Sequence, residues 1–235
     1  MNTYLTLTGV AFIAVTVVFY GLVVRQLSKA LTLSGWSQEK QLRIRRGTVL
    51  VLAGWALVLA ILGLTGVAGN FDLFPLNAAP VLLIPMIGCL LVVFSGKTRH
   101  LLQFVPEKAI INLNVFRLFV EILLWLLFIQ NLTPIQMTFE GRNFDVLTAI
   151  TAPIAASLFA SKKWALIGWN ILGLCLLLNI VIIALLSMPT PFRVFDNEPA
   201  NTIVLTWPFI LLPGMLVPLA YYLHFLSIRQ LTLRK

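Results

Sequence analysis

Two opposite charges stand inside the stretch NVFRLFVEILLWLLF (residues 114–128), which is otherwise almost entirely hydrocarbon. Arg117 and Glu121 are four positions apart, so a helix would place them on one face, where they could pair with each other. At the centre of a bilayer, one charged side chain costs about 2.5–3.5 kcal/mol on insertion scales. Such residues therefore face a protein interior or a wet cavity, where they bind a solute or carry a proton. We expect Arg117 and Glu121 to form the floor of a polar cavity.

A second polar group lies in the stretch MTFEGRNFDVLTAITAP, at the start of another apolar segment. It consists of Glu140, Arg142, Asn143 and Asp145, and the segment would be too short to cross a membrane without them. Arg142 and Asp145 are three positions apart and would share a helix face, and Asp145 suits the positive end of a helix dipole. Two interpretations stay open: an exposed, capped helix start with a local ion pair, or the outer wall of the cavity.

Three further polar side chains fall within apolar segments. Asn170 and Asn179 occupy one segment, and buried amides of this kind commonly hold membrane helices together. Asn179 is also a candidate contact for a ligand. His224 lies near the end of the last segment, where we expect an interfacial position and no catalytic role.

Several chemistries are excluded by residues that the chain lacks. A retinal protein needs a lysine in its last membrane helix, and residues 202–226 contain none. Membrane zinc hydrolases and bis-haem proteins need histidine clusters, whereas this chain has two histidines in all, and no P-loop, GxSxG or HExxH motif occurs. We therefore expect no metal and no cofactor. An enzyme built on the carboxylates Glu121, Glu140 and Asp145 stays as a minor alternative.

The composition places these groups in an integral membrane protein. Of the 235 residues, 60% are hydrophobic and 11% charged, against about 25% charged in an average soluble domain. Seven apolar stretches are long enough for membrane helices. They are residues 4–24, 47–68, 76–95, 111–131, 139–160, 165–187 and 202–226. We predict an all-α fold with a single transmembrane domain over residues 1–235.

Basic side chains indicate how these helices are oriented. Most of the 17 Lys and Arg residues fall in alternate connections, at residues 25–46, 96–110 and 162–163 and in the C-terminal tail. Because basic loops stay in the cytoplasm, the N-terminus is expected outside and the C-terminus inside, in a cytoplasmic (inner) membrane that the chain crosses several times. The same rule explains the net charge of +9 without nucleic acid as a partner.

A repeated motif, F-D-x-x-P-x-N, precedes the third and the seventh apolar stretches. It occupies Phe71, Asp72, Pro75 and Asn77 in the first copy and Phe195, Asp196, Pro199 and Asn201 in the second. Each copy is followed by a P-x-x-x-x-P pair, and parallel repeats of this kind build some transporters. The pattern predicts a 3+1+3 arrangement, with residues 1–95 and 139–226 as repeats and residues 111–131 as the linker helix.

The stretches MTFEGRNFDVLTAITAP and SMPTPFRVF are similar to those of a family of small, uncharacterised seven-helix bacterial membrane proteins. The resemblance covers the second half of the chain best, and it implies no catalytic residue because that family has no assigned activity. The 3+1+3 plan is similar to that of the SWEET sugar transporters and the PnuC-type vitamin transporters in topology alone, which does not imply their function.

These observations favour a protein that binds and transports a small polar or charged solute through an outward-facing polar cavity. The expected partners are the lipid bilayer and the solute, and the oligomeric state is open. The candidate binding residues are Arg117, Glu121, Glu140, Arg142, Asn143, Asp145 and Asn179. The alternatives are a receptor or membrane interaction partner without transport, which could use the basic segment 25–46, and the carboxylate enzyme.

Overall fold

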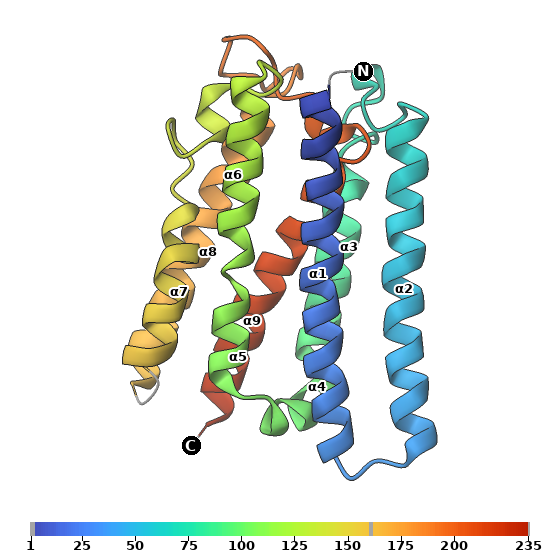
Figure 1. Cartoon of the computed structure of the whole chain (residues 1–235), viewed down its shortest axis with the longest axis vertical. Coiled ribbons are helices and arrows are strands. Elements are labelled where there is room, and N and C mark those ends of the chain that lie inside the picture. The colour runs from blue at the N-terminus through green and yellow to red at the C-terminus, as the bar shows by residue number, and fades with distance from the viewer. Residues whose placement is uncertain (1–2, 160–161, 235) are drawn as a thin grey trace.

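The chain folds back and forth along one long axis (Figure 1). The computed structural model describes residues 3–159 and 162–234, and the regular structure within these ranges is helical, as expected. The elements used below are α1 (Thr3–Leu33), α2 (Gln38–Leu64), α3 (Ala79–Phe94), α4 (Gly96–Leu101), α5 (Glu107–Leu113), α6 (Phe116–Ile129), α7 (Val146–Leu158), α8 (Lys163–Leu186), the π-helical turn η5 (Leu212–Leu216) and α9 (Val217–Leu233).

Several of these helices could cross a membrane. Among the described residues, four are long and apolar enough: α1, α2, the column formed by α5 and α6, and α8. The pair of α3 and the segment Gly96–Phe104 would add a fifth crossing if it is one span, although it is bent by 57°. α7 is apolar but has only 13 residues. Length and hydropathy therefore support four or five crossings, fewer than the seven apolar stretches of the sequence.

The basic segment 25–46 is helical over most of its length, although it was expected to be a connection. α1 continues to Leu33 and α2 begins at Gln38, so only a short turn joins them. Ser37 caps α2, because its side chain accepts a hydrogen bond from the backbone N–H of Lys40. The segment is rich in residues with high helix propensity, so both helices extend beyond their apolar parts. Its cationic side chains therefore lie on helix ends.

The last apolar stretch also differs from expectation, because its α-helix begins only at Val217. The preceding turn η5 contains Pro213, which has no N–H to donate and interrupts the helical hydrogen bonds. Freed carbonyls in a membrane need partners. Pro218, in the first turn of α9, cannot donate to the oxygen of Gly214, which accepts from Trp55 Nε1 (2.8 Å); the oxygen of Met215 accepts from Tyr20 Oη (3.0 Å). Side chains of α1 and α2 thus stabilise the break.

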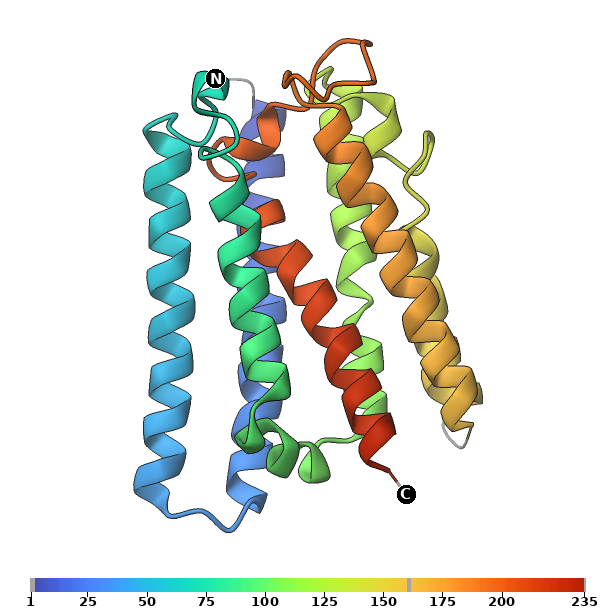
Figure 2. The same cartoon turned by 180° about the vertical axis from the view of Figure 1, so that it is seen from behind.

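α9 lies in the interior of the bundle. It crosses between α3 and α8 (Figure 2) and packs against both of them and against α5. Its neighbours cover it so fully that two of its polar side chains, His224 and Ser227, have no exposed surface. The interfacial position expected for His224 is therefore wrong, because tertiary packing places this helix at the centre.

Candidate functional site

A buried ion pair joins α6 to the start of α7. Arg117 is 2% exposed; its Nε donates to Asp145 Oδ2 (2.6 Å), and its Nη2 pairs with the second carboxylate oxygen. The ion pairs that the spacing allowed, Arg117–Glu121 and Arg142–Asp145, are not formed among the described residues. Asp145 approaches from another helix and can present both oxygens to the planar guanidinium group, a fork that favours bidentate pairing.

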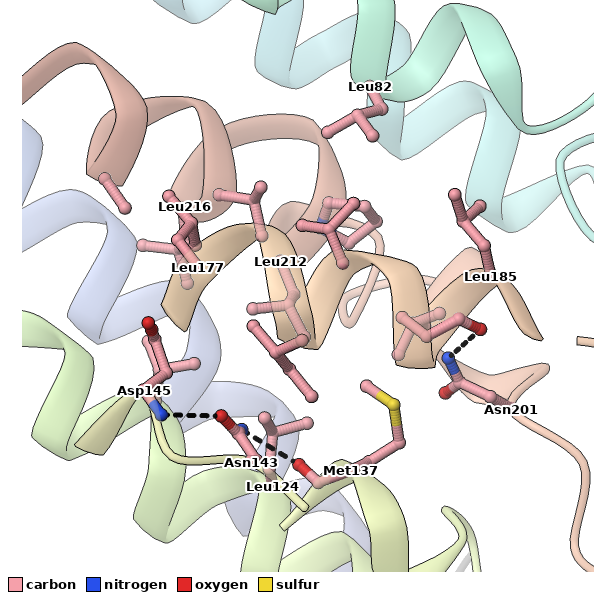
Figure 3. A pocket seen from close by; sticks show the side chains of 18 of the residues that line it. Leu82, Leu124, Met137, Asn143, Asp145, Leu177, Leu185, Asn201, Leu212 and Leu216 are labelled. Atoms are coloured by element: carbon pink, nitrogen blue, oxygen red, sulfur yellow. Dashed lines mark hydrogen bonds between the residues drawn. The ribbon is translucent and has the colours of Figure 1, made fainter. Parts of the chain in front are cut away.

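Glu121 has an amide as its partner. Its side chain is 2% exposed, and both of its oxygens accept from Asn143 Nδ2 at 2.7 Å. Asn143 also donates to the backbone oxygen of Met137 (3.0 Å), and its own oxygen accepts from the backbone N–H of Asp145 (3.1 Å) (Figure 3). Asn143 thus connects the two carboxylates and holds the segment before α7 inside the protein.

His224, on α9, extends this cluster. Its Nε2 lies 2.7 Å from Arg117 Nη1, and its Nδ1 lies 2.9 Å from Asn170 Oδ1. A guanidinium group can only donate and an amide oxygen can only accept, so Nε2 accepts and Nδ1 carries the proton. His224 is therefore neutral. Asn170 Nδ2 in turn donates to Ser227 Oγ (3.0 Å), which ties α8 to α9.

A glycine on α8 permits the contact between Arg117 and His224. A Cβ atom at Gly173 would lie 2.4 Å from His224 Cε1, which is closer than non-bonded atoms can approach. The backbone oxygen of Gly173 also accepts from Arg117 Nη2 (3.5 Å). Sequence reasoning missed the close approach at Gly173 and the place of His224 in the buried cluster. A signal for His224 was available in the sequence: His224 and Ser227 are three positions apart, which places two polar side chains on one face of an apolar helix.

The other three candidate residues lie outside the buried cluster. Glu140 is exposed and accepts from Trp125 Nε1 (2.7 Å). Arg142 is also exposed, and its guanidinium group lies 5.4 Å from the ring centre of Phe195. Asn179 Nδ2 donates to the backbone oxygen of Arg142 (3.0 Å), so it fastens α8 to this turn. These contacts fit the interpretation of an exposed turn for Glu140 and Arg142.

A cavity of about 90 Å³ lies beside the charged residues. Arg117, Glu121, Asn143 and Asp145 line one part of it, and Asn201 lies on the far side of the apolar residues in Figure 3. Most of the remaining wall consists of Leu, Ile, Val, Met and Phe side chains from α3, α6, α8 and the η5–α9 segment. The cavity was expected to be polar, but the structure shows an apolar chamber with one charged patch. Within the described ranges, no three His, Cys, Asp or Glu side chains are arranged to hold a metal ion.

Comparison with known proteins identifies a family. A family model described as a domain of unknown function (DUF8737) matches residues 73–232, which include the buried cluster and the residues that line the cavity. No curated protein and no solved structure matches the chain. The match shows an uncharacterised family, and no transporter family is found.

Proposed function

We propose that this chain, which belongs to the DUF8737 family, binds a small polar or charged solute in the cavity beside Glu121 and transports it across a membrane. The observation that carries the proposal is a void next to buried ionic side chains inside a bundle of apolar helices. Ionisable residues within membrane helices are rare, and they mark solute or ion pathways. Ligand sites also combine mostly apolar walls with a few placed polar groups.

The proposal includes seven crossings, with the N-terminus outside and the C-terminus in the cytoplasm of a bacterial cell. The course of the chain supports this arrangement, because the N-terminus lies at one end of the bundle and the C-terminus at the other (Figure 1). The α1–α2 turn and α4 lie at the C-terminal end. Near that turn, Arg25, Arg45 and Arg46 line a groove between α1 and α2. Basic side chains at one end fit a cytoplasmic face.

The 3+1+3 repeat is also part of the proposal, and two equivalent hydrogen bonds support it. Asn77 Nδ2 donates to the backbone oxygen of Ala68 (3.0 Å), just after α2. Asn201 Nδ2 donates to that of Ala184 (3.2 Å), near the end of α8. In both copies of the motif, the asparagine therefore fastens its segment to the end of the helix before it. The first segment leads into α3, and the second leads into η5 and α9. Asn201 also lines the cavity.

A flux assay tests the transport proposal. The purified protein is reconstituted in liposomes, and uptake of a panel of labelled cationic, anionic and neutral small solutes is measured. We expect flux of at least one class, reduced at least tenfold in Glu121→Leu. The matched control Glu140→Gln, at an exposed carboxylate, should keep the wild-type rate. Specific binding without flux would identify a receptor instead, and a folded protein with neither would refute the proposal.

A further inference from the structure

We infer that the solute of this cavity is a small cation with a short apolar body, which pairs with the Glu121 carboxylate. The inference rests on the function proposed above and names the class of its ligand.

Among the described residues, the buried cluster contains one carboxyl group, that of Glu121, that no cationic side chain pairs with. Arg117 and Asp145 form a bidentate ion pair and neutralise each other. His224 is neutral, because its Nε2 accepts from Arg117 and its Nδ1 donates to Asn170. Among the charged residues that line the cavity in the described chain, Glu121 is left without an ionic partner.

The contacts of Glu121 fit an ionised carboxylate. Both oxygens accept from Asn143 Nδ2 at 2.7 Å, and the oxygen of Asn143 already accepts from the backbone N–H of Asp145. A protonated carboxyl group would need an acceptor for its own proton, and the hydrogen bonds of Glu121 in the described chain come from a donor. A carboxylate has about four acceptor sites, so further ones remain for a ligand in the cavity.

The cluster does not offer an equivalent site for an anion. Of the residues that the structure describes, Arg117 is the cation that lines the cavity, and four of its five N–H groups are engaged. Two of them hold Asp145, one donates to His224 and one to the backbone oxygen of Gly173. An anion would have to displace Asp145 to gain a bidentate contact, and it would also lie beside Glu121.

The size and the walls of the cavity restrict the rest of the ligand. An apolar cavity of about 150 Å³ holds a benzene-sized molecule. A cavity of about 90 Å³ therefore accepts roughly four non-hydrogen atoms by the same proportion. Side chains such as Val120, Leu124 and Leu177 supply apolar walls. A short alkylammonium ion places its head against Glu121 and its alkyl chain against these walls.

Three probes of nearly equal size and different charge test the inference by titration calorimetry on the protein in nanodiscs. We expect propylammonium to bind at least tenfold more tightly than acetamide or acetate, which have the same number of non-hydrogen atoms. Glu121→Gln should reduce its affinity at least tenfold, because glutamine keeps an acceptor for Asn143 and removes the charge. Glu140→Gln should leave its affinity unchanged, since Glu140 is exposed and bonded to Trp125.

The wild-type comparison decides the question even if a variant fails to fold. Acetate or acetamide binding as tightly as propylammonium overturns the inference, as does full affinity in a folded Glu121→Gln protein or the absence of propylammonium binding. The two proposals also fail separately. Flux of an anion or a neutral solute alone would keep transport and refute the cation, whereas propylammonium binding without flux would keep the cation and refute transport.

Discussion

Replacing Asp145 with asparagine distinguishes the two candidate partners of Arg117. In the structure, Asp145 neutralises a guanidinium group that is 2% exposed, and Glu121 one turn along α6 does not. Removing one member of a buried ion pair costs about 3–5 kcal/mol, since the other charge is left buried and unpaired. Asparagine keeps one acceptor oxygen, so we expect a loss near the lower limit, about 3 kcal/mol. At about 1.4 kcal/mol per factor of ten, the unfolding equilibrium constant should rise roughly 100-fold.

Glu121→Gln is the matched comparison for this experiment. Glutamine keeps an oxygen that accepts from Asn143, and it removes a buried charge that has no ionic partner, so the free energy of unfolding should stay the same or rise. Both variants are measured by reversible unfolding with SDS in mixed micelles, followed by circular dichroism. If Glu121→Gln were strongly destabilising and Asp145→Asn neutral, Arg117 would pair with Glu121, and the assignment of its partner would be refuted.

Two further predictions concern the packing of the cluster and the loop after α8. Gly173→Ala should lose about 1–3 kcal/mol of stability in the same assay, because its Cβ would collide with His224. The control Gly168→Ala should be neutral or gain up to about 1 kcal/mol, since a Cβ there meets no atom within 4 Å; equal losses would contradict this prediction. Outside the helices, a hydrogen bond from Arg193 Nη2 (2.9 Å) lowers the pKa of Glu198. The contribution of this bond to loop stability is therefore present above the ordinary glutamate pKa, and it is lost as the pH falls through the lowered pKa. Arg193→Gln should raise the pKa of Glu198 toward the ordinary value in a carbon-13 NMR titration, and an unchanged pKa would show that the bond does not persist in solution.

The sequence by itself determined the helical class and the candidate charges. Apolar runs longer than 20 residues are local features, and backbone groups in lipid can satisfy themselves within a helix. Arg117 and Glu121 could be selected as buried charges because any charge in such a run carries a large cost on the lipid-facing side. The same local reasoning placed Asn143 and Asp145 near them, since all four residues stand out from apolar surroundings.

Only the tertiary structure decided which polar groups meet. Arg117 contacts Asp145, which is 28 positions away in the sequence, and His224, which is 107 positions away. Periodicity along one helix cannot predict contacts between residues so far apart in the sequence. The spacing of His224 and Ser227 marks a polar face, but the burial of His224 could not be predicted, because it depends on α9 crossing the interior of the bundle (Figure 2). The apolar wall of the cavity likewise combines several helices, so its shape exists only once they pack. The sequence determined which side chains cannot face lipid, and the packing of α6, α7, α8 and α9 decided which of them neutralise one another.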